Sequence, residues 1–154
     1  MMEAYVHRVH YYETDKMGCV HHSNHVRWME EARVAYLERI GVPFTLLEAR
    51  GVYSPVVGVE CRYRRPAHFD EEIRVEVRIR SFDRLRLKIG YEMIRVSDGE
   101  LIATGSSEHC FTDLDGRPIA LSKTHPDLDA ILRAQIEPQT ESGKKHSENP
   151  AKGD

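Results

Sequence analysis

The spacing of hydrophobic and polar residues divides the chain into a short strand-like segment, a helical segment and a long strand-rich segment. Residues 4–13 alternate loosely and contain Val and Tyr, which predicts a first strand. Between Ser23 and Ile40 the apolar residues recur with the period of a helix, and charged residues surround them. The apolar face comprises Val26, Met29, Ala32, Tyr36, Leu37 and Ile40. The pattern therefore predicts one strand followed by one long amphipathic helix.

Residues that begin or end helices flank this segment. Ser23 or Asn24 is expected to cap the long helix, because a short polar side chain there can accept a hydrogen bond from a free backbone N–H group. Gly41 is placed to end this helix, and Gly51 to end a shorter predicted helix over 44–50.

From Gly51 onward the apolar residues recur at every second position, which is typical of half-buried strands. Turns are predicted at Ser97–Glu100 and at Asp115–Gly116. The predicted strands are 56–63, 73–80, 85–93 and 101–112, and a short helix is expected over 125–133. We therefore expect an α+β fold in which an antiparallel sheet wraps around one long helix.

The size and charge of the chain limit the kinds of protein that it can be. With 154 residues, of which 40% are hydrophobic, the chain can bury the core of one domain. A net charge of −3 argues against a dedicated nucleic-acid-binding protein. The chain contains no run of about 18 apolar residues, so no membrane-spanning helix is predicted. We expect one domain over 1–136 and a disordered polar tail over 137–154, because the tail has almost no apolar residues.

The number and spacing of the cysteines indicate the cellular compartment in which the protein is expected. Cys19, Cys61 and Cys110 are odd in number, widely spaced and without a Cys-x-x-Cys pair, so we expect reduced thiols. The N-terminus enters a strand pattern at once and lacks the apolar stretch of a signal peptide. The expected location is the cytoplasm.

The densest group of chemically active residues lies in residues 11–33, YYETDKMGCVHHSNHVRWMEEAR. Asp15 stands in a short glycine-containing loop between the predicted strand and the long helix, and His21, His22 and His25 follow it. A carboxylate beside a helix start can act as nucleophile or general base, while free backbone N–H groups there can receive an oxyanion. The arrangement suits attack on a polarised carbonyl group.

Other interpretations of this stretch stay open. Asp15 could simply form a turn or cap a helix, since Asp is common in loops. His21 and His25, or His22 and His25, have spacings that suit metal ligands on a helix, but no third ligand completes a set and we expect no metal. Cys19 adjoins the loop without a partner pattern for a nucleophile, so a packed thiol is favoured.

The whole stretch resembles the N-terminal signature of the hotdog-fold acyl-CoA thioesterases of the 4-hydroxybenzoyl-CoA thioesterase and YbgC type. That signature runs aromatic, acidic, Thr-Asp, small residues with Gly, His, and then an aromatic-Glu-x-Ala-Arg helix. The resemblance implies that Asp15 is the catalytic carboxylate and that His22 orients the thioester or assists proton transfer. It also implies that Gly18 lets the backbone approach the substrate and that amides near Val20 to His22 form the oxyanion hole.

Three further residues in this stretch bear on the shape of the acyl pocket. His21 and His25 fall where the family often has Tyr, so both depart from the signature and affect the shape and polarity of the pocket. Trp28 either lines the acyl pocket or belongs to the core.

A second block, Tyr63-Arg64-Arg65-Pro66-Ala67-His68-Phe69-Asp70-Glu71-Glu72, resembles a Tyr-x-x-Pro-Ala-x-x-Asp-Asp stretch of the same family. Arg62, Arg64 and Arg65 could contact the phosphates of coenzyme A, because guanidinium is a good phosphate partner. The alternative is that each arginine only belongs to a solvated strand face.

The function that the resemblance implies is hydrolysis of an acyl-CoA thioester to a carboxylic acid and coenzyme A, without a metal or redox cofactor. It also implies a homodimer or a homotetramer, since hotdog subunits commonly place acyl sites at a dimer interface. Two alternatives are kept: a thioesterase for acyl groups on acyl carrier protein, and a non-catalytic protein that binds acyl groups or coenzyme A. An intact Asp15 speaks against the second of these.

Overall fold

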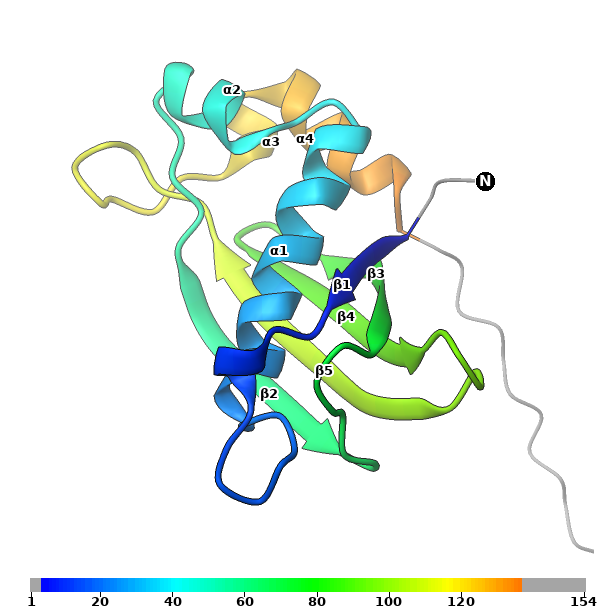
Figure 1. Cartoon of the computed structure of the whole chain (residues 1–154). Helices are drawn as coiled ribbons and strands as arrows, with labels where there is room; N and C mark the ends of the chain where they lie inside the picture. Colours follow the sequence, from blue (N-terminus) through cyan, green and yellow to red (C-terminus); the bar gives the residue numbers. More distant parts are fainter. Residues whose placement is uncertain (1–3, 137–154) are drawn as a thin grey trace, which may run out of the picture.

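The computed structural model describes residues 4–136, so the tail predicted over 137–154 lies outside the described residues. The elements are β1 (Tyr5–Arg8), a 3-10 turn η1 (Tyr11–Glu13), α1 (Ser23–Arg39), α2 (Phe44–Ala49), β2 (Val56–Tyr63), β3 (Glu72–Phe82), β4 (Arg86–Arg95), β5 (Leu101–Cys110), α3 (Leu121–Thr124) and α4 (Pro126–Ala134). Figure 1 shows α1 running across the sheet, with α2, α3 and α4 gathered at one end.

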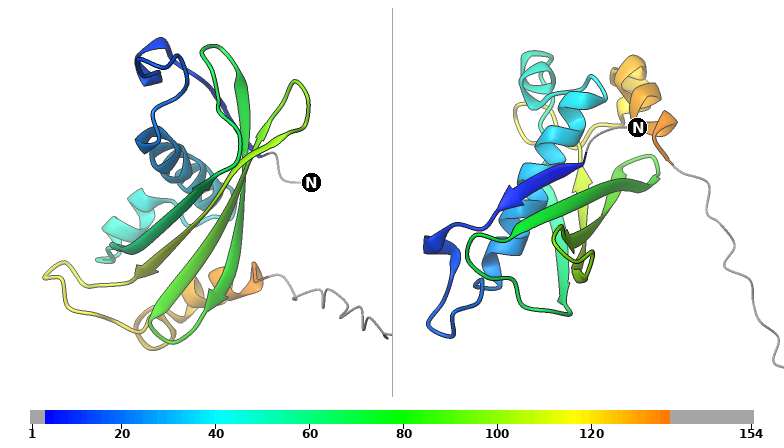
Figure 2. Two further views of the ribbon diagram at one scale, coloured as in Figure 1. Left: turned by 90° about the horizontal axis from the view of Figure 1, so that it is seen from below. Right: turned by 45° about the vertical axis from the view of Figure 1, so that its right-hand side comes forward.

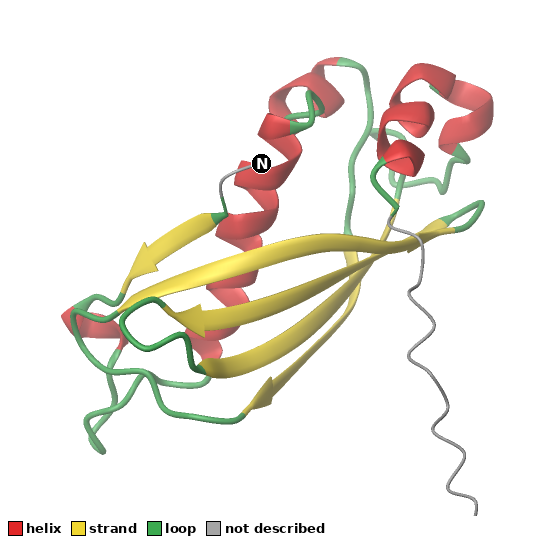
Figure 3. Ribbon diagram, turned by 90° about the vertical axis from the view of Figure 1, so that its right-hand side faces the viewer, coloured by secondary structure: helices red, strands yellow, loops and turns green. Residues whose placement is uncertain are grey.

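The strands form one five-stranded sheet in the order β1-β3-β4-β5-β2, and every neighbouring pair is antiparallel. The long helix α1 covers one face of this sheet, and no described helix covers the other face (Figures 2 and 3). The predicted α+β architecture, a sheet wrapped around one long helix, is confirmed. The loop that carries Asp15 lies at the end of α1 opposite α2 (Figure 1).

The core forms between α1 and the inner face of the sheet. Trp28, Met29 and Ala32 of α1 are at most 1% exposed, and they pack in one cluster with inward residues such as Ile73 and Met93. Apolar burial of this kind is the main favourable term in folding. Gly105 on β5 lets the helix approach closely, because any side chain there would collide with the sulfur of Met29.

Several details of the prediction are wrong. The first strand ends at Arg8 rather than residue 13, because the chain turns into η1 once Val9 has donated its N–H to the Glu71 carbonyl at 2.9 Å. Val26 is 37% exposed, although we placed it on the apolar face of the helix. The residue before the first turn of α1 is His22, and no side chain caps it.

A polar chain crosses the apolar core. Arg33 of α1 donates to the Tyr91 hydroxyl at 3.1 Å, Tyr91 lies 2.7 Å from the Ser107 hydroxyl, and Ser107 lies 2.7 Å from His109 Nε2. Burial, aided by the positive charge of Arg33, lowers the pKa of His109 to about 4. The imidazole of His109 is therefore neutral in the folded protein at neutral pH.

We expect acid to destabilise the protein partly through His109. In the unfolded chain a histidine titrates near pH ~6.5, so the unfolded state takes up its proton first. The stabilisation present above that pH is therefore lost as the pH falls toward about 4, by up to about 3 kcal/mol. Urea unfolding of His109→Asn between about pH 7 and about pH 5 should show a shallower pH dependence than the wild type. His68→Asn, which alters an exposed histidine, is the control, and equal slopes in all three proteins would contradict this account.

Candidate active site

The Asp15 loop is a tight turn whose backbone bonds fix the position of the carboxylate. The Asp15 N–H donates to the Cys19 carbonyl at 2.8 Å, and the Gly18 N–H donates to the Asp15 carbonyl at 3.0 Å. Gly18 has a φ of +83°, which only glycine adopts without strain. Asp15 Oδ1 accepts the Met17 N–H at 2.8 Å, and the Cys19 sulfur lies 3.8 Å from Oδ1 and 4.0 Å from Oδ2. One oxygen of the carboxylate is thus held and the other is available for chemistry.

This carboxylate faces a cavity of about 340 Å³ built from three segments that are distant in the sequence. They are the Asp15 loop, the start of α1 and the end of β2 with the residues that follow it. Backbone contacts join the Asp15 loop to the residues that follow β2. Cys19 and His68 form an isolated antiparallel β-bridge, and the Val20 N–H donates to the Ala67 carbonyl at 2.8 Å. The lining residues are Asp15, Met17, Cys19, Val20, His22, His25, Tyr63, Arg64, Arg65, Pro66 and Ala67.

The structure brings together most of the predicted site residues and leaves out four. Those that line the cavity are Asp15, Val20, His22, His25, Arg64 and Arg65. Gly18, His21, Trp28 and Arg62 do not line it. Gly18 shapes the turn, His21 hydrogen-bonds the Ser23 hydroxyl at 2.8 Å, and Trp28 is completely buried. Trp28 therefore belongs to the core, which was one of the two alternatives for it.

Only one of the three amides expected near the oxyanion position is available. The Val20 N–H donates to the Ala67 carbonyl, and the His21 N–H donates to the Glu13 carbonyl, both at 2.8 Å. Among the hydrogen bonds of the described residues, none uses the N–H of His22. His22 directly precedes α1, where backbone N–H groups and the helix dipole favour negative charge.

The aromatic wall of the cavity is made by Tyr63 and two histidines. His25 is 3% exposed, and its ring lies 4.8 Å from both the Trp28 and the Tyr63 rings. Burial lowers the pKa of His25 to about 4, so this imidazole is neutral at physiological pH. The Tyr63 hydroxyl donates to the His22 carbonyl at 2.7 Å, and burial, together with Cys61, raises the pKa of Tyr63 to about 12. Tyr63 therefore serves as a hydrogen-bond donor that fixes the helix start.

The sequence analysis missed the residue that anchors this loop, Glu13. It is 4% exposed, and its carboxylate accepts hydrogen bonds at 2.7 Å from His7 Nε2, from the His10 N–H and from Trp28 Nε1. Its carbonyl accepts the His21 N–H and the Asn24 side chain. Burial alone would raise the pKa of Glu13, but the hydrogen bonds outweigh it and lower the pKa. Glu13 thus ties β1, η1 and α1 together directly before Asp15.

The three arginines near the cavity differ in their partners. Arg62 pairs with Glu60 at 2.9 Å and does not reach the cavity. Arg65 pairs with Glu100 at 3.1 Å. Arg64 has no recorded ion pair among the described residues, and it lines both the Asp15 cavity and a neighbouring hollow of about 630 Å³. Its guanidinium group is therefore the one most available to an anion.

A second large cavity lies away from this site. It has a volume of about 610 Å³ and lies between α2 and the segment that precedes β2. Its lining includes Phe44, Glu48, Tyr53 and Thr112, and it contains no histidine. The Asp15 cavity, by contrast, combines a carboxylate, imidazoles and cations.

The fold and the site together define a class of enzyme. An antiparallel sheet wrapped around one long helix is the hotdog fold, and the comparisons with known proteins assign the chain to the thioester hydrolases of this fold. The sequence pattern of the thioesterase-like superfamily matches residues 9–140, so the chain belongs to this superfamily. Among the described residues, no helix combines the length and the apolar character that crossing a membrane requires.

Individual relatives agree with this assignment. YneP of Bacillus subtilis, whose name assigns it provisionally to the acyl-CoA thioesterases, is 35% identical over 120 residues, covering 77% of this chain and 86% of YneP. A DHNA-CoA thioesterase structure from Staphylococcus aureus is 31% identical with a TM-score of 0.81, covering 86% of this chain and 89% of that one. A Thermus thermophilus protein described as hypothetical is 35% identical with a TM-score of 0.75, covering 87% and 97% of the two chains.

Proposed function

We propose that this protein hydrolyses acyl-CoA thioesters and that Asp15 performs the chemistry. The observation that carries the proposal is the cavity that Asp15, His22 and Arg64 line together, next to a His22 N–H with no hydrogen-bond partner among the described residues. The superfamily and the names of relatives that act on CoA esters support a CoA substrate. The test is release of free coenzyme A from a panel of short, long and aromatic acyl-CoA esters.

The geometry supports two routes that share one carboxylate oxygen. As general base, Asp15 Oδ2 takes a proton from water, and the hydroxide adds to the thioester carbonyl. As nucleophile, Oδ2 adds to the carbonyl itself, and water then cleaves the resulting anhydride. In both routes the oxyanion is received by the His22 N–H group, and its collapse breaks the C–S bond and releases the CoA thiolate. His22, at the same cavity, assists by positioning the thioester or by transferring a proton.

Arg64 is proposed to bind a phosphate group of coenzyme A. Replacing Arg64 with Ala should raise KM for an acyl-CoA about tenfold while kcat changes little, because one charge-assisted hydrogen bond to the distant part of the substrate is lost. Arg62→Ala is the matched control, since Arg62 lies two residues away but pairs with Glu60 outside the cavity. A KM that rises equally in both variants would remove Arg64 from the binding site. Arg65, paired with Glu100, is proposed to contribute less.

Two related functions are separated by the same assay. A thioesterase for acyl carrier protein would cleave the pantetheine-linked acyl group on that protein faster than the matching CoA ester. A non-catalytic protein would bind CoA esters without releasing coenzyme A. Turnover of CoA esters that depends on Asp15 excludes the non-catalytic protein, and a CoA ester cleaved faster than the matching carrier-protein ester excludes the carrier-protein thioesterase.

We further propose that the protein is a homodimer joined through β2. This strand lies at one edge of the sheet. Its exposed apolar residues have exposed fractions from 46% to 52%, and they are Val56, Val57, Val59 and Tyr63. An edge strand with exposed apolar side chains gains from pairing with a second strand. Because Tyr63 also lines the Asp15 cavity, a second copy seated here would border the site. Pairing of two such dimers would give a tetramer.

A charge placed on this edge should dissociate the dimer. We expect Val59→Lys to weaken association at least about tenfold, because it buries a cation in an apolar contact. The measurement is sedimentation equilibrium, with Val6→Lys as control, since Val6 is 47% exposed on the opposite edge strand β1. A monomeric wild type, or equal dissociation in both variants, would refute the β2 interface.

The cytoplasm is the proposed location. The three cysteines are free in the structure, which suits a reducing compartment.

A further inference from the structure

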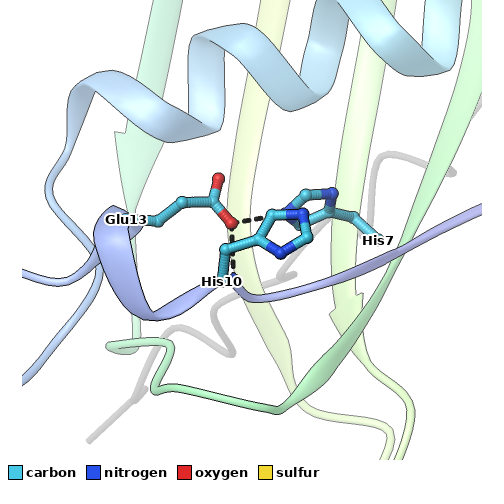
Figure 4. A group of neighbouring side chains, drawn as sticks. All are labelled: His7, His10 and Glu13. Carbon is cyan, nitrogen blue, oxygen red and sulfur yellow. Dashed lines mark hydrogen bonds and ion pairs between the residues drawn. The ribbon is translucent and has the colours of Figure 1, made fainter.

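A second group of ligand-type side chains lies beside the site, on the other side of Glu13. One ring nitrogen each of His7 and His10 and one carboxylate oxygen of Glu13 lie within 4.8 Å of one another. Figure 4 shows His7 and Glu13 approaching each other, with His10 alongside. The three residues follow a His-x-x-His-x-x-Glu pattern, in which His7 lies on β1, Glu13 ends η1 and His10 lies between these elements. We propose that His7, His10 and Glu13 form a binding site for a divalent transition metal of the zinc type.

The ligand set suits such an ion. Zinc sites in proteins use imidazole nitrogen and carboxylate oxygen, and two histidines with one glutamate are a known set with a fourth position for water. Metal–ligand distances near 2.0–2.1 Å place ligand atoms roughly 3.3 Å apart in a tetrahedron. His10 is exposed, so rotation of its side chain can close the remaining gap and an ion can enter from solvent. The ion would replace the hydrogen bond that now joins His7 Nε2 to Glu13 Oε1 at 2.7 Å.

The proposed ligands His7 and Glu13 have hydrogen-bond partners that orient them, as metal ligands in proteins usually do. The second nitrogen of His7, Nδ1, lies 3.3 Å from the Glu31 carboxylate and 3.3 Å from the Tyr5 hydroxyl. A carboxylate behind a ligating histidine orients its ring and makes it a better donor. The second oxygen of Glu13 is held by Trp28 Nε1 at 2.7 Å. Both buried ligands are therefore already oriented toward the proposed ion.

The charge of this corner also favours a cation. His7 and Glu13 are only 5% and 4% exposed, so their surroundings screen charge poorly. Among the described residues, the carboxylates of Glu13 and Glu31 both contact the one imidazole of His7, at 2.7 and 3.3 Å. Two carboxylates facing one histidine leave a negative surplus that a divalent ion offsets. A bound ion would link β1, η1 and, through Trp28, the helix α1 just before the Asp15 loop.

The test is metal binding by the full chain after treatment with a chelator. Titration with Zn²⁺ in a calorimeter, and with Co²⁺ by its visible absorption, should show one equivalent bound with nitrogen and oxygen ligands. The variant His10→Ala should bind at least about tenfold more weakly, and it should fold normally because His10 is exposed. His68→Ala, which removes another exposed histidine beside a glutamate, is the matched control and should bind as the wild type does.

Thermal unfolding gives a second readout that does not depend on catalysis. Zinc at about 100 times its Kd should raise Tm of the wild type and of His68→Ala by at least about 5 °C, and should raise Tm of His10→Ala far less. Failure of the wild type to bind one equivalent, or equal binding by His10→Ala, would show that the cluster is a hydrogen-bonded group only. Neither result would bear on the proposed role of Asp15.

Discussion

Replacing Asp15 with Asn is expected to reduce kcat for acyl-CoA hydrolysis by about 10²- to 10⁴-fold, the range that a positioned general base contributes. The amide of the variant keeps an oxygen for the Met17 N–H but loses the basic, nucleophilic oxygen Oδ2. The turn should therefore survive while the chemistry does not. The measurement is steady-state release of coenzyme A, followed with a thiol reagent.

The control for this prediction is Asp83→Asn, which alters a carboxylate that accepts backbone N–H groups in the turn between β3 and β4 and does not line the Asp15 cavity. It should hydrolyse the same ester at the wild-type rate. KM of Asp15→Asn should stay close to that of the wild type, since the proposed phosphate contact at Arg64 is unchanged. Unchanged kcat in Asp15→Asn would remove Asp15 from the chemistry.

Replacing Glu13 with Ala is expected to destabilise the protein by about 3 to 5 kcal/mol, because each buried donor left without its acceptor costs about 1 to 3 kcal/mol. Three donors, from His7, His10 and Trp28, would be left without their acceptor in a site that is 4% exposed. Urea unfolding in the presence of a chelator measures the loss without a contribution from metal binding. Activity should fall as well, because the Glu13 segment positions the Asp15 loop.

The matched control is Glu31→Gln, since Glu31 faces the same His7 from a side chain that is 47% exposed. An exposed ion pair contributes little, so this variant should lose less than about 1 kcal/mol. If the two variants differed by less than about 0.5 kcal/mol, Glu13 would not be the anchor described above.

The order of helices and strands was predictable because it depends on local patterns. The alternation over 73–80 and the helical period after Ser23 each indicate which side chains face the core. The structure confirms the strand β3 and the helix α1 at these places. Details that depend on tertiary contacts were not predictable. Val26 lies on the predicted apolar face of α1 but is 37% exposed in the folded chain.

Most of the residues that line the candidate site were predictable from the sequence, but their hydrogen-bond partners were not. The short spacing from Asp15 to His25, with the resemblance to a known signature, indicated which residues share the cavity, and Arg64 and Arg65 join them through the fold. The occupied amides of Val20 and His21 were not predictable, because their acceptors lie on Ala67 and Glu13. Glu13 occupies the acidic position of the signature, but its burial and anchoring role were not predictable, since its partner Trp28 is fifteen positions away. A buried charge is recognised by its partners, and these come together only in the folded chain.

The most direct test of the central claim is the position of a bound thioester. A crystal structure of the Asp15→Asn variant with an uncleaved acyl-CoA would show where the reacting carbonyl group lies. Our account predicts the carbonyl carbon within about 3.5 Å of the side chain at position 15, its oxygen toward the His22 N–H, and a phosphate near Arg64. A thioester bound in the cavity beside α2, with position 15 out of reach, would contradict it.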